Sequence, residues 1–188
     1  MRREIRITGL GGQGAITAGH ILGRAASIYD RREAVMTEGY SPYITGGWSR
    51  ADLIISDDPV DFPLVSSVDI LVAMYKEGLE TNLKMVKPDG IALSESRLAR
   101  PFEANQKEKR RVLSVPAAAT AEQLGKKMLT NVLMLGALEA IAPVVNFDSL
   151  KKALIDRFPK AAELNLSAID KGYELGLKAA TELKIAIG

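Results

Sequence analysis

Short apolar runs alternate with helical patterns along the first two thirds of this chain of 188 residues. Runs with the length and composition of β-strands fall at 5–8, 34–37, 53–56, 70–74, 90–93 and 112–115. The run at 70–74 is apolar throughout, which is typical of a central strand covered on both faces. Strands that alternate with helices form mostly parallel sheets. The sequence therefore predicts an open α/β sheet with helices packed on it.

One connection departs from this alternation. Residues 38–49 have no helical period, and Gly39, Pro42, Gly46 and Gly47 interrupt the segment. Because a parallel crossover usually contains a helix, we expect a long loop that joins antiparallel neighbours or crosses the sheet edge. Long loops of this kind are often functional.

The helical patterns cover 13–29, 76–86, 120–142, 149–158 and 160–186. Thr120 and Gln123 have the spacing of a capping box, and Asp148 is a suitable N-cap for the fourth helix. The segment 128–138 is apolar on every side. This indicates either a seam in a homodimer or hetero-oligomer, or a helix buried within the fold.

Composition excludes several kinds of chemistry. The chain has no cysteine and one histidine, His20. It therefore forms no disulfide, offers no cysteine nucleophile and holds no iron–sulfur cluster by itself. We assign no catalytic and no metal-binding residue, and on such a helix His20 is expected to be structural. The net charge of +2, the lack of a long apolar segment and the lack of a signal sequence favour a cytoplasmic protein that binds neither nucleic acid nor membrane.

The strongest local motif is the glycine-rich segment 9–14, which follows the first strand and opens the first helix. In this context Gly9 permits a tight turn, Gly11 a close approach to a phosphate, and Gly14 close helix packing. Gly12 and Gln13 complete the loop. The helix start offers free N–H groups to an anion. A phosphate-bearing ligand is one interpretation, and a glycine-rich turn without a ligand is the other.

The sequence leaves the identity of such a ligand open. NAD would require an acidic residue at the end of the second strand, and Glu38 has about that position. The Gly12-Gln13 pair is not typical of the dinucleotide motif, however, and no Gly-Lys-Ser/Thr of a P-loop is present.

Two further features complete the candidate site. The loop 39–49 combines Gly46 and Gly47 with the aromatic residues Tyr40, Tyr43 and Trp48, so it lines a ligand or an interface, or packs as an ordinary surface loop. Asn131 lies in the apolar helix, where a buried amide requires a partner. We expect Asn131 either to hydrogen-bond to the backbone or to line the site.

Together these segments resemble the gamma subunit of 2-oxoacid:ferredoxin oxidoreductases. The resemblance rests on 5–14, 46–56, 69–74, 115–117 and 131–137, and on Asn165, Ala168, Gly172 and Tyr173. It covers most of the chain and departs in the loop, where Tyr43 and Thr45 occupy the positions of an acidic residue and an arginine. The choice of 2-oxoacid therefore stays open.

The resemblance implies one Rossmann-like α/β/α domain over residues 1–188, with a mostly parallel sheet, an antiparallel strand and C-terminal helices. It implies a complex with alpha, beta and ferredoxin-like delta subunits that decarboxylates a 2-oxoacid, forms an acyl-CoA and reduces ferredoxin. Thiamine diphosphate and the iron–sulfur clusters belong to the other subunits, and the isolated chain is expected to be inactive. The residues expected to face CoA or the thiamine cofactor are Gly9, Gly11, Gly12, Gln13, Gly14, Tyr40, Gly46, Gly47 and Asn131. The alternatives are an independent NAD-binding domain and a purely structural assembly subunit.

Overall fold

A computed structural model describes residues 1–42, 47–98 and 111–182 of the chain. Six strands form one sheet in the order β2-β3-β1-β4-β5-β6. Their bounds are β1 Arg2–Leu10, β2 Glu33–Tyr40, β3 Trp48–Ser56, β4 Val68–Ala73, β5 Val86–Glu95 and β6 Arg111–Val115.

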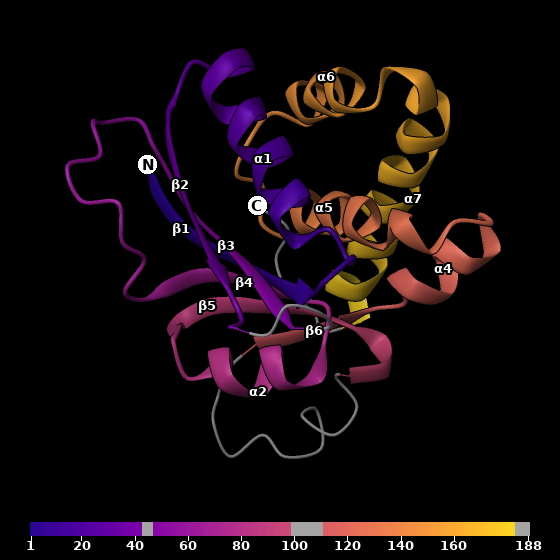
Figure 1. Ribbon diagram of the computed structural model, residues 1–188, viewed down its shortest axis with the longest axis horizontal. Helices are drawn as coiled ribbons and strands as arrows, with labels where there is room; N and C mark the ends of the chain where they lie inside the picture. The colour runs from indigo at the N-terminus through magenta and orange to yellow at the C-terminus, as the bar shows by residue number, and fades with distance from the viewer. Residues whose placement is uncertain (43–46, 99–110, 183–188) are drawn as a thin grey trace.

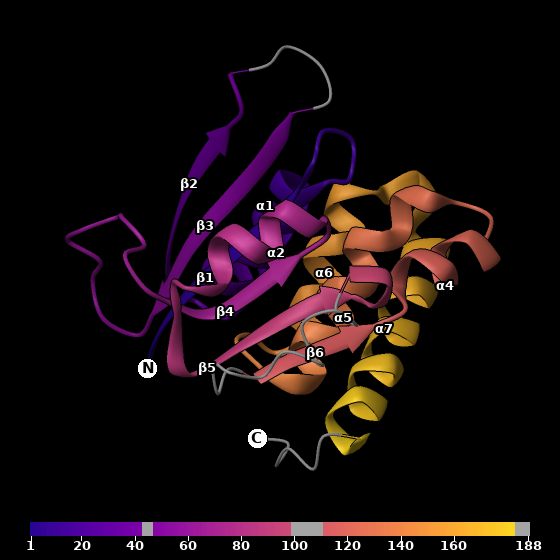
Figure 2. The ribbon, with the colours of Figure 1, turned by 90° about the horizontal axis from the view of Figure 1, so that it is seen from below.

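The sheet is mostly parallel, as predicted. β4, β5 and β6 follow β1 in parallel pairs, whereas β3 pairs antiparallel with both β1 and β2. The connection after Tyr40 thus joins antiparallel neighbours, which was one of the two expectations. The expected loop at 38–49 was too long, because residues 38–40 belong to β2 and residues 48–49 to β3. Figure 2 shows β2 and β3 as a hairpin at one edge of the sheet, with the long helix α7 on the opposite side of the molecule. The chain builds the sheet first on one side of β1, with β2 and β3, and then on the other side, with β4, β5 and β6, so the carboxyl end of β1 is a topological switch point.

Helices cover both faces of the sheet (Figure 1). One face carries α2, and the other carries the first helix and the C-terminal helices, which confirms the three-layer prediction. The bounds are α1 Ala15–Arg24, continued by a π-helical turn Ala25–Tyr29, then α2 Lys76–Leu83, α4 Ala117–Gln123, α5 Thr130–Ile141, α6 Phe147–Arg157 and α7 Ala162–Glu182. Within the described ranges, no helix combines the length and the apolar content that a bilayer crossing needs.

The core has two parts because successive strand residues point to opposite faces. Ile5 and Ile7 pack in the larger cluster, under α1 and the C-terminal helices. Ile54 and Leu71 pack in the smaller cluster with Leu79 of α2.

A buried ion pair lies on the α2 face of the sheet. Arg6 of β1 donates from Nε and Nη2 to the two carboxylate oxygens of Asp52 on β3, at 2.6 and 2.7 Å. Both residues are at most 5% exposed. Nη1 of Arg6 also donates to Asn82 Oδ1 of α2 at 2.8 Å. The pair therefore links two strands and the helix above them.

Two helix predictions were wrong. The expected helix at 120–142 is two helices, because Gly125 adopts a φ of +79° that ends α4. Thr120 is no cap: it lies inside α4, where its hydroxyl donates to Pro116 O. The cap of α6 is Asn146 rather than Asp148, and Asn146 Oδ1 accepts from the Asp148 N–H at 2.9 Å.

The apolar helix α5 is buried within the fold. Eleven of its residues are buried, and it packs directly on α7. A Cβ on Gly136 would lie 2.2 Å from Ile169 O, and a Cβ on Gly172 would lie 2.2 Å from Leu133 O. These glycines let the two helix backbones touch. For most of the apolar segment 128–138, burial within the fold is the explanation that the structure supports, but Met128 at its start is 78% exposed.

The end of α5 carries a buried carboxyl group. Glu139 is 3% exposed, and its Oε2 accepts from the Val144 N–H at 3.0 Å. Its Oε1 has no hydrogen-bond partner in the described part of the chain. Burial raises the pKa of Glu139 to about 8, although the N–H groups of Val144 and Val145 oppose this shift. The side chain is therefore mostly protonated at neutral pH.

Candidate functional site

The glycine-rich loop follows β1 at the switch point of the sheet. Gly12 and Gly14 have φ values of +88° and +78°, which favour glycine. Gln13 fastens the loop: its Oε1 accepts from the Leu10 N–H at 2.6 Å, and its Nε2 donates to Met74 O at 3.1 Å. The side chain of Gln13 thus joins the loop to the end of β4.

The helix α1 begins directly after this loop. Its N-cap is Gly14, no side chain caps it, and its first turn contains no acidic residue. The first N–H groups of the helix, from Ala15 to Thr17, therefore lack a capping acceptor and carry the positive end of the helix dipole.

Asn131 of α5 holds this helix start in place. Its Nδ2 donates to Gly14 O at 3.1 Å, and its Oδ1 accepts from the Val132 N–H at 2.9 Å. A Cβ on Gly14 would lie 2.4 Å from Asn131 Nδ2. Glycine is thus required at this position by both backbone angle and space.

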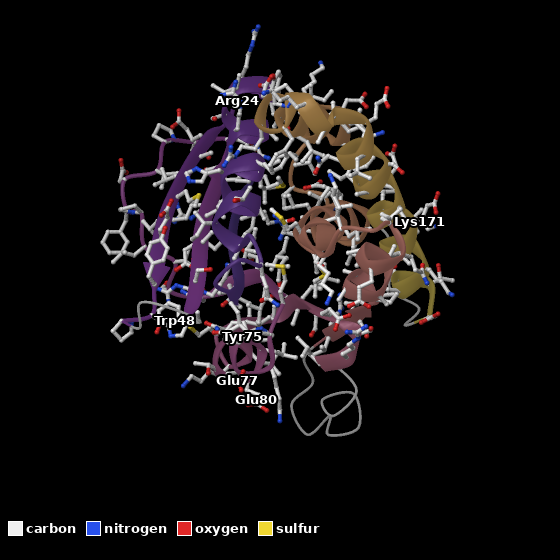
Figure 3. All side chains as sticks on the ribbon, turned by 45° about the vertical axis from the view of Figure 1, so that its right-hand side comes forward. Arg24, Trp48, Tyr75, Glu77, Glu80 and Lys171 are labelled. Carbon is white, nitrogen blue, oxygen red and sulfur yellow. The ribbon has the colours of Figure 1, made fainter. Side chains whose placement is uncertain are left out.

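The β2–β3 hairpin lies against the glycine loop. Leu10 pairs with Trp48 at the end of the β1–β3 ladder, and the Gly11 N–H donates to Gly47 O at 2.8 Å. Figure 3 shows Trp48 at the end of the hairpin strands. Tyr40 is 59% exposed, and its hydroxyl donates to Glu38, which also bonds His20 Nε2 at 3.0 Å. This hydrogen bond to the Glu38 carboxylate raises the pKa of Tyr40.

A cavity of about 730 Å³ opens between the helix start, the hairpin and the C-terminal helices. This volume lies within the range of roughly 300–1,000 Å³ typical of small-molecule sites. Its lining residues come from segments far apart in the sequence: Gly11, Gly12, Gly14, Ala15, Ile16, Thr17, Tyr40, Ser41, Gly47, Trp48, Ser49, Lys126, Met128, Leu129, Asn131, Val132, Arg157, Phe158, Ala161, Leu164 and Asn165.

The lining suits an anion with an apolar portion. Lys126 and Arg157 bring positive charge to the uncapped start of α1, and none of the described lining residues is acidic. Phe158, Leu164 and Val132 form apolar wall nearby. Positive charge, a helix dipole and an apolar wall together support binding of a phosphate-bearing ligand that has an uncharged arm.

The structure brings six of the nine predicted site residues to this cavity. Gly11, Gly12, Gly14, Tyr40, Gly47 and Asn131 line it. Gly9 lies within β1 and does not, because its position faces the side chains of Met74 and Gln13. Gln13 lines a smaller cavity on the other side of the loop, beside Met74 and Glu95. Gly46, like Tyr43 and Thr45, lies outside the described residues.

Sequence reasoning missed Lys126, Arg157 and Phe158. Lys126 follows the bend at Gly125, and Arg157 and Phe158 end α6 just before Pro159. The only sequence signal for the two basic residues was a helix-breaking residue close by, Gly125 for Lys126 and Pro159 for Arg157. Across the described residues, no group of three or more His, Asp or Glu side chains is placed to hold a metal ion.

The position of Glu38 does not suit NAD. In the dinucleotide fold the acidic residue follows the strand next to β1. Here β3 lies between β1 and β2, and Glu38 is hydrogen-bonded to His20 and Tyr40. Glu38 is also absent from the lining of the cavity at the glycine loop.

Comparison with known proteins assigns this architecture to a family. The sequence model of the pyruvate ferredoxin/flavodoxin oxidoreductase family matches residues 4–175. The chain is 40% identical to the 2-oxoglutarate synthase subunit KorC of Methanocaldococcus jannaschii, over 93% of this chain and 94% of that relative. It is 31% identical to the pyruvate synthase subunit PorC of Methanothermobacter marburgensis, over 91% of this chain and 96% of PorC.

A solved structure shows the same fold. The keto/oxoacid ferredoxin oxidoreductase gamma subunit of Geobacter sulfurreducens superposes with a TM-score of 0.80 at 34% identity, covering 94% of this chain and 99% of that chain.

The chain therefore belongs to the pyruvate ferredoxin/flavodoxin oxidoreductase family. Within that family it is a gamma subunit of a 2-oxoacid:ferredoxin oxidoreductase, and so part of a multi-subunit oxidoreductase. This confirms the resemblance drawn from the sequence.

Proposed function

We propose that this subunit supplies the CoA-binding cavity of a complex that oxidatively decarboxylates a 2-oxoacid. The complex would contain alpha, beta and ferredoxin-like delta subunits, transfer the acyl group to CoA and pass the electrons to ferredoxin. The observation that carries the proposal is the cavity at the uncapped start of α1, with Lys126 and Arg157 in its lining and no acidic lining residue among those described.

The residues of the cavity fit CoA by chemistry. The nucleotide end of CoA carries phosphates, which match the free N–H groups at Ala15–Thr17 and the two cationic side chains. The remainder of CoA is a long uncharged arm, which matches the wall formed by Phe158, Leu164 and Val132. Tyr40 and Trp48 add aromatic surface at the hairpin.

The chain does not fit an iron–sulfur cluster, because it has no cysteine to ligate one. We place the clusters and thiamine diphosphate on the partner subunits. On this proposal residues 1–188 form one domain that acts in the cytoplasm, and the isolated chain has no activity. A homodimer of the free chain is compatible with this assignment.

We further propose 2-oxoglutarate as the substrate. The support is the higher identity to KorC, at 40%, than to PorC, at 31%. The test is ferredoxin reduction by the complete complex with 2-oxoglutarate, pyruvate and 3-methyl-2-oxobutanoate in turn. The proposal requires the highest kcat/KM with 2-oxoglutarate, and a preference for either other acid contradicts it.

The CoA site is tested by Gly11→Val in the assembled complex. A Cβ on Gly11 meets only Gly47 O, at 3.6 Å, so a side chain is tolerated at this position, which lines the cavity. We expect the Kd for CoA to rise about tenfold or more, which corresponds to a loss of roughly 1.4 kcal/mol.

Gly23→Val is the matched control, since a Cβ there meets only Leu53 Cδ2 at 3.7 Å and Gly23 does not line this cavity. If Gly11→Val assembles and binds CoA as the control does, the cavity is not the CoA site. The subunit is then structural, and its glycines serve only close packing.

A further inference from the structure

Two buried asparagines line the cavity, and they differ in what their amide groups bond. Asn131 and Asn165 are 5% and 6% exposed. Both atoms of the Asn131 amide serve the chain itself, through Gly14 O and the Val132 N–H. Asn165 of α7 makes one hydrogen bond within the described chain, from Nδ2 to Ala161 O at 2.9 Å.

The orientation of the Asn165 amide follows from that bond. Ala161 O is an acceptor, so the amide nitrogen must face it and the oxygen must point elsewhere. Oδ1 of Asn165 accepts no hydrogen bond from the described residues, while the residue lines the cavity. Asn165 therefore presents an unused acceptor to the cavity from a side chain that is otherwise buried.

The wall of the cavity that Asn165 lines is partly apolar. Phe158 and Leu164, which are close to Asn165 in the sequence, line the cavity, and so does Val132 of α5. A ligand that fills the cavity without offering a donor would leave this amide oxygen without a hydrogen bond, which is costly, so the oxygen favours a ligand that brings one. Lys126 and Arg157 are positively charged and suit the phosphates of a ligand. The neutral amide oxygen of Asn165 suits an uncharged N–H donor.

We propose that Asn165 Oδ1 accepts a hydrogen bond from an amide N–H of the pantetheine arm of CoA. This rests on the proposed CoA site and adds a specificity residue to it. The phosphates then lie at the start of α1, and the arm runs along the apolar wall past α7. Asn131, by contrast, is a positioning residue that holds the helix start.

The test combines a variant with CoA analogues in the assembled complex. In each of two analogues, one pantetheine amide is replaced by a ketone, so that the N–H becomes CH₂ and the carbonyl stays. Asn165→Leu removes the acceptor at similar volume. The Kd of each ligand is measured for the wild-type complex and for the variant, which gives a double-mutant cycle.

Thr181→Val is the matched control. Thr181 lies on the same helix and makes the same kind of bond, from its hydroxyl to Leu177 O four residues earlier, but it does not line the cavity. Asn165→Ala provides a second variant should Asn165→Leu fail to assemble.

In the wild-type complex and the Thr181 control, one analogue is expected to bind about 5- to 30-fold more weakly than CoA. In the Asn165 variants that analogue and CoA should bind equally. The inference is overturned if neither analogue is weaker in the wild type, or if the same loss persists in the Asn165 variants. Failure of the CoA site itself is distinguishable, because Gly11→Val would then leave the Kd for CoA unchanged.

Discussion

A side chain at Gly14 would collide with Asn131 of α5, whereas a side chain at Gly12 would collide with nothing. Both glycines have positive φ, +78° and +88°, so alanine is strained at either position. A Cβ on Gly12 has no neighbour within 4 Å, whereas one on Gly14 lies 2.4 Å from Asn131 Nδ2. Comparing Gly14→Ala with Gly12→Ala therefore isolates the contact between the loop and α5.

The two substitutions share the backbone cost. A left-handed conformation costs an L-residue about 1–2 kcal/mol, and the entropic effect on the unfolded chain is the same for both. Gly14→Ala also displaces Asn131 and breaks its 3.1 Å bond to Gly14 O. Loss of a buried hydrogen bond costs about 1–3 kcal/mol. We expect Gly14→Ala to be more destabilising than Gly12→Ala by that amount.

The assay is urea unfolding of the full chain, with Asn131→Ala as a third background. Once Asn131 is alanine, Gly14→Ala and Gly12→Ala should have equal costs, because the crowded group is gone. Equal costs in the wild-type background would refute the role assigned to Asn131.

Three further predictions concern stability. Gly136→Ala should lower the free energy of unfolding by about 3 kcal/mol or more, because its Cβ meets Ile169 O at 2.2 Å; circular dichroism during urea unfolding measures this. Because the pKa of Glu139 is raised to about 8, the contribution of this side chain to stability is fully present below the unfolded value of 4.5 and is lost as the pH rises through 8. Glu139→Gln should remove this part of the pH dependence, and an unchanged slope would contradict the assignment. Asp52→Ala should cost about 3–5 kcal/mol because it leaves Arg6 buried without its partner, and a cost under about 1 kcal/mol would contradict that.

Much of the fold was predictable because its determinants are local. The glycine loop and the pattern after it predicted α1, and the missing helical period at 38–49 predicted the antiparallel pair β2–β3. The break in 120–142 was not predictable from periodicity, because the apolar pattern continues through the bend at Gly125. The cap of α6 depends on a distant contact, since the Asn146 N–H donates to Asp30 Oδ2 at 2.7 Å.

The site was predictable only in part. Gly11, Gly14 and Asn131 belong to motifs that stand out in the sequence. Arg157 belongs to no motif, and Asn165 entered only through the family resemblance and was not predicted as a site residue. Only the packing of the C-terminal helices on α1 brings them to the glycine loop.

Residue type alone misleads on α7. Lys171 stands on the outer surface of the helix (Figure 3) and pairs with Glu174 at 2.7 Å. Asn165 of the same helix is buried and lines the cavity. The charged residue has the more conspicuous side chain, yet the neutral amide is the one that lines the cavity.

Hydrogen exchange of the assembled complex with and without CoA tests the central claim most directly. If CoA occupies this cavity, saturating CoA must slow exchange of the amides at 15–17, at the start of α1, and at 157–165. The lining of the cavity by these segments predicts protection in both at once. CoA that saturates the complex but leaves both segments unprotected would show that this subunit does not hold it.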